Sequence, residues 1–129
     1  MDHTIVHFEI PVDDIERAST FYRDVFGWEI SKMPGPFEYY GLRTTATDEK
    51  GMPKGPGVNG GLMKRMHPAH LPTTYFGVED VDAYAAKLVE AGGEICMPKM
   101  AVPGHGWMVH FKDPEGNTFA LWQGDSAAA

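Results

Sequence analysis

Two polar residues on one expected strand are the first candidates for chemistry in this sequence. His7 and Glu9 are separated by a single residue within Val6–Trp28, which reads VHFEIPVDDIERASTFYRDVFGW. Alternate residues of a strand share a face, so these side chains lie about 6–7 Å apart along it. An imidazole beside a carboxylate can act as a general base with an orienting partner, or can anchor the polar end of a ligand. A hydrogen-bonded pair with a structural role is an equally open interpretation.

Two further histidines are candidates for contact with a ligand. His110 alternates with apolar residues that suit the core, so its side chain is predicted to face away from the core. Together with His7 and Glu9, it would give an alternative set of three metal ligands. His105 stands between two glycines in the segment PGHGW, in a loop that could close over a bound molecule.

Aromatic and sulfur side chains are candidates for the walls of a binding cleft. Alternation places Tyr75, Met108 and Trp122 on the faces of their strands that look away from the core. Such side chains offer a ligand large apolar contact areas. Tyr39 and Tyr40 are adjacent on another expected strand, so one of the two is expected in the core and the other on the opposite face.

The composition limits the classes of function and partner. The chain has 129 residues, 43% of them hydrophobic, which is typical of one folded domain with a real core. Its net charge of −7 argues against a nucleic-acid partner. No apolar run approaches a membrane span and no signal peptide is expected, so we expect no membrane partner. The single cysteine, Cys96, excludes an internal disulfide, favours a cytoplasmic location and is expected to be buried.

The polar pair depends on a strand that runs straight into a helix. Apolar residues alternate with polar ones along the strand, which turns His7 and Glu9 away from the core. Asp13 and Asp14 end the strand and can cap the helix that follows, and Gly27 ends that helix. The apolar positions at helical spacing are Ile15, Ala18, Phe21, Tyr22, Val25 and Phe26.

The same strand and helix pattern returns later in the chain. Thr74–Cys96 aligns with the first copy when Val78 is placed on Val12. Two copies in so short a chain indicate a duplicated module. The alignment also places His7 opposite Thr73, so the two copies differ in their capacity for chemistry.

Each copy is predicted to have the order β-α-β-β-β. Module one covers about residues 5–65, a linker residues 66–72, module two about residues 73–123, and a frayed tail residues 124–129. Further strands of module one are expected at Trp28–Met33, Phe37–Arg43 and Val58–Arg65. Module two is expected to contain a helix at Val81–Ala91 and strands at Glu94–Pro98, Trp107–Lys112 and Thr118–Gln123. His67 and His70, in the proline-containing linker, are interpreted as surface residues.

The ordered set of motifs resembles the vicinal oxygen chelate superfamily, which includes glyoxalase I, extradiol dioxygenases and the bleomycin-resistance proteins. The motifs are FYRDVFGW at the first helix end, GGLM closing module one and DPEGN before the last strand, within Ile5 to Gln123. The chain is most similar to the glyoxalase-related branch of unassigned substrate. The resemblance implies an α+β fold whose two modules form an open cleft lined by curved sheets, and a homodimer.

The resemblance also implies positions for a metal. Metal-dependent members place one ligand on the first strand of each module and one on the last strand. The first-strand positions fall on His7 and Thr73. The last-strand positions fall on Gly61 and Ala120. Only His7 fits, because Gly and Ala offer no ligand atom and Thr is a poor ligand for Zn, Ni or Fe. We therefore expect no metal at this site and no other cofactor.

Two hypotheses about function, from different classes, stay open at this point. The first is a protein that binds a small molecule in an aromatic cleft without chemistry. The second is a metal-independent enzyme, of lyase or isomerase type, that uses His7 with Glu9 as a base on a small carbonyl or hydroxy compound. The metal-dependent lactoylglutathione lyase of the superfamily is the least supported, since the chain lacks its metal ligands and has no obvious basic cluster for glutathione's carboxylates. Lys64, Arg65 and Lys112 stay open as candidates for that contact.

Overall fold

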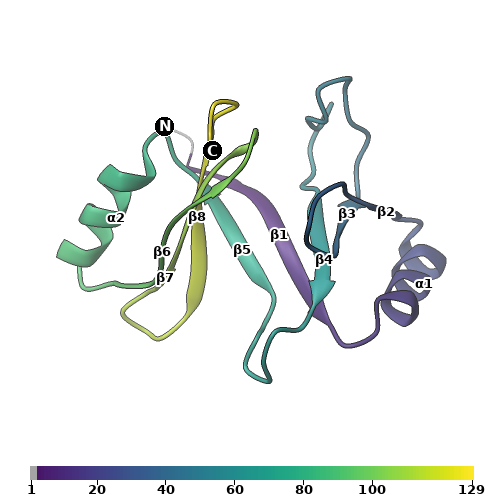
Figure 1. Ribbon diagram of the computed structural model, residues 1–129, viewed down its shortest axis with the longest axis horizontal. Coiled ribbons are helices and arrows are strands. Elements are labelled where there is room, and N and C mark those ends of the chain that lie inside the picture. Colours follow the sequence, from purple (N-terminus) through teal and green to yellow (C-terminus); the bar gives the residue numbers. More distant parts are fainter. Residues whose placement is uncertain (1–2) are drawn as a thin grey trace. The chain divides into compact units, whose positions relative to one another are not determined.

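The secondary-structure elements follow the order β-α-β-β-β twice along the chain, as the sequence predicts. The computed structural model describes residues 3–129 (Figure 1). The first set is β1 (Ile5–Val12), α1 (Ile15–Phe26), β2 (Glu29–Lys32), β3 (Tyr39–Arg43) and β4 (Gly60–Lys64). The second set is β5 (Thr73–Gly77), α2 (Val81–Glu90), β6 (Glu94–Val102), β7 (Gly106–Lys112) and β8 (Thr118–Gly124). The predicted α+β class and the duplicated module are confirmed.

Two compact units divide the chain. Residues His7–Pro72 form the first, which we call the N-terminal unit. Thr73–Ala129, together with the residues up to Val6, form the second, which we call the C-terminal unit. No helix among the described residues is both long and apolar enough to span a bilayer.

The N-terminal unit is built on strands in the order β2-β3-β4-β1. β1 and β4 run parallel, whereas β4 with β3 and β3 with β2 run antiparallel. Val12, Leu42 and Leu62 form the buried centre of its core, and Leu62 is 0% exposed. A long segment between β3 and β4 projects away from the sheet (Figure 1). The partly buried residues packed on this core are Phe8, Ile10, Ile15, Ala18, Tyr22, Trp28, Ile30 and Tyr40.

Helix α1 begins and ends where the sequence predicts. The Asp14 side chain accepts a hydrogen bond from the Arg17 backbone N–H at 2.9 Å, and so caps the helix. Gly27 ends it with φ of 71°, a left-handed conformation that glycine adopts without steric cost. The predicted apolar stripe is wider than the face that packs, because Phe21, Val25 and Phe26 stay more than half exposed.

The C-terminal unit repeats this plan with strands in the order β5-β8-β7-β6. β5 and β8 run parallel, and the other two pairs run antiparallel. Helix α2 is capped by Asp80 and packs on the sheet through Val81, which is 0% exposed. The other buried core residues are Val109, Phe111 and Leu121, so the predicted core faces of β7 and β8 are correct.

Strand β6 departs from the sequence prediction. It continues past Pro98 to Val102, and the loop expected around His105 is reduced to a tight turn before β7. Cys96 is exposed on this strand, so the prediction of a buried thiol is wrong. The physical reason is that β6 is the last strand in the order β5-β8-β7-β6 and its pairing with β7 has irregular register on either side of Met97.

The C-terminal residues are ordered by contacts that local sequence does not show, so the predicted frayed tail is wrong. Ala128 is 4% exposed, and its carbonyl accepts a hydrogen bond from the Gly104 N–H at 2.9 Å. The Trp107 indole N–H donates to the Asp125 carboxylate at 3.0 Å. This hydrogen bond lowers the pKa of Asp125 below its usual range. The tail is therefore attached to the turn between β6 and β7.

Candidate functional site

His7 and Glu9 lie on the face of β1 that looks away from the core of the N-terminal unit. Their neighbours Phe8 and Ile10 pack on the core residues instead, as alternation predicts. The His7 side chain is 32% exposed and the Glu9 side chain 16% exposed. The strand thus presents a donor and acceptor pair on a partly buried surface.

Tyr39 lies between these two side chains. The His7 Nε2 atom is 2.8 Å from the Tyr39 hydroxyl oxygen, and the hydroxyl donates to Glu9 Oε2 at 2.8 Å. The direct separation of His7 Nε2 and Glu9 Oε2 is longer, at 3.7 Å. We call these three residues the polar triad. The prediction for the tyrosine pair is confirmed, since Tyr40 packs on the core and Tyr39 faces the other side.

With Glu9 ionised, its carboxylate can only accept hydrogen bonds, and this gives each group of the triad one role. A phenol hydroxyl has one proton, and Tyr39 donates it to the Glu9 carboxylate. With that proton used, the contact between His7 Nε2 and the same oxygen is a hydrogen bond only in a form of the ring that carries an N–H on Nε2. His7 is thus a donor in this arrangement, and Glu9 is the acceptor. This differs from the sequence-based hypothesis, in which His7 is the base and Glu9 only orients it.

Tyr39 reaches the pair because a glycine occupies the strand between them. Strand β4 lies between β3 and β1, and Gly61 on β4 is opposite Glu9 on β1. A Cβ added to Gly61 would overlap the hydroxyl end of the Tyr39 ring. Gly61 is therefore required for the triad. A glycine inside a strand marks a close approach of another group, and this was the one sequence signal that could have identified Tyr39 as a site residue.

Burial and the neighbouring charge keep the Tyr39 hydroxyl protonated. Removal from water raises the pKa of this hydroxyl above its usual range, and the Glu9 charge with its hydrogen bond raises the pKa further. Tyr39 is therefore a hydrogen-bond donor over the physiological range and cannot serve as a base there.

This raised pKa predicts a pH dependence of stability. Above pH 10.0, the usual pKa of tyrosine, the unfolded chain loses the Tyr39 proton while the folded chain keeps it. The free energy of unfolding should then fall with rising pH by about 1.4 kcal/mol per unit more in wild type than in Tyr39→Phe. Below pH 10 the variant should be less stable by a constant amount, about 1–3 kcal/mol, because Glu9 loses a donor.

Urea unfolding of both proteins at intervals from pH 7 to pH 11 tests this prediction. The interval below pH 10 serves as the internal control, since Tyr39 contributes no slope there. A stability difference that stays constant up to pH 11 would contradict the raised pKa.

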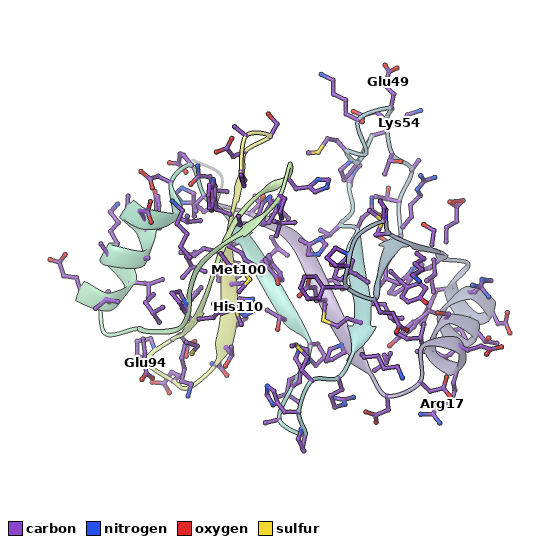
Figure 2. All side chains as sticks on the ribbon, in the orientation of Figure 1. Arg17, Glu49, Lys54, Glu94, Met100 and His110 are labelled. Atoms are coloured by element: carbon purple, nitrogen blue, oxygen red, sulfur yellow. The ribbon has the colours of Figure 1, made fainter. Side chains whose placement is uncertain are left out.

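The C-terminal unit contains a second cluster of predicted site residues. Tyr75 on β5 and His110 on β7 are both paired with Ala120 on β8, which lies between them. Figure 2 labels His110 on the sheet of this unit. The Tyr75 hydroxyl is 3.4 Å from His110 Nε2, and the two rings are nearly perpendicular with centroids 5.8 Å apart. The same hydroxyl donates weakly to Met108 Sδ at 3.9 Å.

Trp122 lies directly opposite Met108 in the ladder between β8 and β7, on the same face of the sheet. The predicted faces of Tyr75, Met108, His110 and Trp122 are therefore correct. Their contact with a ligand stays a prediction.

Three histidines singled out in the sequence lie outside the cluster of their own unit, namely His105, His67 and His70. His105 is exposed in the turn before β7, five residues from His110, and so about 17 Å away along the strand. His67 and His70 stack on each other in the linker with ring centroids 5.6 Å apart. His70 Nδ1 accepts the Met66 N–H at 3.2 Å, and partial burial lowers the pKa of His70. These contacts give the linker histidines a local structural role.

Three of the four residues at the superfamily's metal positions, Gly61, Thr73 and Ala120, do not fit a metal. Gly61 has no side chain, and Tyr39 fills the space where one would lie. Ala120 offers only a methyl group and is 0% exposed, and Thr73 is buried with a hydroxyl as its only donor atom. Within either unit, the described residues include no group of three His, Cys, Asp or Glu side chains that could hold a metal ion. The set of His7, Glu9 and His110 combines residues of both units and stays a prediction.

Sequence comparison finds relatives over most of the chain. The family model of the Glyoxalase/Bleomycin resistance protein/Dioxygenase superfamily matches residues 4–121. The chain is 32% identical over 130 residues to the anthracycline biosynthesis protein DnrV of Streptomyces peucetius, and equally to DauV of Streptomyces sp. strain C5. These matches cover 90% of this chain and 45% of each relative. The chain therefore spans about half the length of the curated relatives it matches.

Structural comparison finds the same fold in enzymes. A variant of Streptomyces coelicolor methylmalonyl-CoA epimerase, in complex with 2-nitronate-propionyl-CoA, has a TM-score of 0.71 to this chain. The match covers 100% of this chain and 99% of the epimerase, at 17% sequence identity. At this identity the likeness shows a shared fold and carries no residue roles.

Proposed function

Because the chain belongs to the Glyoxalase/Bleomycin resistance protein/Dioxygenase superfamily, we propose that it binds a small organic molecule through the polar triad, without a metal. The observation that carries this proposal is the position of the Tyr39 hydroxyl, held at 2.8 Å from both His7 and Glu9. The two flanking groups form a site for one oxygen atom that both accepts and donates a hydrogen bond. A hydroxyl or enol group of a ligand has this property.

The partial burial of the triad supports binding at this place. Glu9 is only 16% exposed, and a carboxylate out of water gains more from a donated hydrogen bond than one on the surface. A ligand hydroxyl that reaches Glu9 would replace or extend the bond that Tyr39 makes. The donor state of His7 adds a second, oppositely directed contact to the same oxygen.

The comparisons support a small organic ligand in general terms. The relatives DnrV and DauV are named for anthracycline biosynthesis, and the epimerase structure holds a CoA ester analogue. Neither name assigns a ligand to this chain. The homodimer and the cytoplasmic location expected from the sequence stay predictions.

A proton-transfer enzyme is the second candidate function. The observation that favours it is the bond from the Tyr39 hydroxyl to Glu9, in which the carboxylate accepts a hydrogen bond from an oxygen. In such an enzyme Glu9 would take a proton from a small carbonyl or hydroxy compound, and the His7 N–H would stabilise the developing charge on oxygen. The substrate class is the one expected from the sequence, with the roles of the two residues exchanged.

A ligand screen with a His7 variant tests the proposal. Small carbonyl and hydroxy compounds are tested against wild type by thermal shift, where a ligand at a hundred times its dissociation constant should stabilise the fold by about 2.7 kcal/mol. His7→Ala should weaken binding by about 0.5–1.5 kcal/mol, the worth of one hydrogen bond. The ligand should be recovered unchanged, and the chelator EDTA should leave its affinity unaltered.

His67→Ala is the matched control, since His67 lies in the linker and should leave the affinity at the wild-type value. Conversion of the ligand by wild type, with a loss of about a hundredfold or more in Glu9→Gln, would favour the enzyme instead. Binding that neither His7→Ala nor Glu9→Gln alters would place the ligand elsewhere and reject both candidates.

A further inference from the structure

Two glycines form a bare stretch of backbone beside the polar triad. Gly41 on β3 and Gly61 on β4 are directly opposite each other, and Gly61 is in turn opposite Glu9 on β1. Paired residues share a face of a sheet. On this face β1 therefore carries the Glu9 carboxylate, and the neighbouring positions on β4 and β3 carry no side chain. We call Gly41 and Gly61 the glycine platform.

Side chains from the same unit cover this platform. The hydroxyl end of the Tyr39 ring lies over Gly61, where even a methyl group would overlap it. The Met33 Sδ atom covers Gly41, at 3.2 Å from the position that a Cβ would occupy. The Tyr39 phenol therefore lies over the Gly61 part of the platform, with its oxygen between His7 and Glu9. The bare backbone thus matches the flat ring, and His7 and Glu9 match its hydroxyl group.

We propose that the glycine platform is a binding site for a hydroxylated aromatic ring, and that Tyr39 occupies it as an internal substitute for the ligand. The inference rests on the proposed function, because it uses the same His7 and Glu9 contacts. It goes further in assigning the chemical class of the ligand, a phenol. It also assigns Tyr39 the role of a side chain that must leave before the ligand binds.

The contacts favour a phenol over other compounds that carry a hydroxyl group. Backbone without side chains gives an aromatic ring a close apolar contact, and Met33, which covers Gly41, offers a sulfur of the kind that packs favourably against a ring edge. The hydroxyl satisfies His7 and Glu9 together, whereas an aromatic ring without it would leave both polar groups without this partner. A phenolate would repel the Glu9 carboxylate, so the neutral phenol is the form that fits.

Removal of the Tyr39 ring provides the direct test. The variant Tyr39→Ala opens the space over Gly61, and 4-methylphenol is the compound that replaces the missing side chain. Isothermal titration should show saturable binding of 4-methylphenol to Tyr39→Ala, with an affinity at least tenfold above that of wild type. Toluene, which has the same ring without the hydroxyl, should bind at least tenfold more weakly. Adding Glu9→Gln to the variant should weaken 4-methylphenol by at least tenfold.

Tyr40→Ala is the matched control, because it removes the same side chain from the core face of the same strand. It should show no gain in binding of 4-methylphenol over wild type. Tyr39→Val, which keeps a side chain that favours strands, repeats the titration should Tyr39→Ala not fold. Wild type itself provides a third measurement, since saturating 4-methylphenol should shift the NMR signals of the His7 ring.

Several outcomes would overturn the inference. A folded Tyr39→Ala or Tyr39→Val that does not bind 4-methylphenol would reject the platform as a phenol site. Equal affinity for toluene, or indifference to Glu9→Gln, would show a nonspecific apolar cavity. No shift of the His7 signals in wild type would reject displacement of Tyr39. If the screened ligands depend on His7 but have no phenol group, the proposed function stands and only this inference fails.

Discussion

Replacing Gly61 with alanine is expected to destabilise the protein by about 2.5–6 kcal/mol and to remove ligand binding at the polar triad, because the added methyl group fills the space that either the Tyr39 ring or a ligand ring would occupy. The added methyl group overlaps the Tyr39 ring, and forcing a side chain out of a packed position costs about 1–3 kcal/mol. Displacing Tyr39 also breaks its hydrogen bond to the Glu9 carboxylate, a bond worth about 1.5–3 kcal/mol. Urea unfolding measures the first effect and titration with a screened ligand the second.

Gly55→Ala is the control for this substitution. Nothing lies within 4 Å of a Cβ at Gly55, so the same chemical change should alter stability by less than about 0.5 kcal/mol. Equal stabilities of Gly61→Ala and Gly55→Ala would show that the Tyr39 ring does not lie over β4. A Gly61→Ala variant that loses stability but keeps its ligand affinity would show that ligand binding does not depend on the packing of Tyr39.

A second large effect is expected in the core of the N-terminal unit. Leu62 is 0% exposed at the centre of the cluster that holds Phe8 and Ile10, the neighbours of the polar residues on β1. Leu62→Ala should lower the free energy of unfolding by about 2–5 kcal/mol, through lost burial and the cavity left behind. This is a large fraction of the 5–15 kcal/mol that is typical for whole domains, and urea unfolding measures it.

Val25→Ala tests the same kind of truncation on the surface of the same unit. Val25 is 57% exposed on α1, so its loss should cost less than about 1 kcal/mol. A Leu62→Ala variant that loses no more stability than Val25→Ala would contradict the position of Leu62 in the core.

The periodic elements of the fold could be predicted from sequence because their signals are local. Alternation along β1 places His7 and Glu9 on one face, and the cap Asp14 marks where α1 begins. Most strand ends differ from the predicted ones by one or two residues, as at β4, which begins at Gly60 and not at Val58. Such differences arise because pairing with neighbouring strands, and not local preference, determines where a strand ends.

The features that the sequence did not predict depend on contacts between distant segments. Glu9 and Tyr39 are 30 positions apart in the sequence, and their contact depends on the register of three strands. Cys96 is exposed because β6 has a free edge, which no local pattern indicates. The tail is held by Trp107, whose contact with Asp125 is likewise a product of the folded sheet. In each case the missing information is the register or order of strands.

The covalent attachment of Tyr39 to strand β3 has a consequence for any free phenol. A group tethered within the same chain competes for the site at an effective concentration in the millimolar range or above. Diluting the protein does not weaken this competition with a dissolved ligand. The apparent affinity for a phenol is then the intrinsic affinity of the open site multiplied by the fraction of molecules in which Tyr39 has rotated away. The observed association rate should level off at high phenol concentration, at the rate at which the Tyr39 side chain departs.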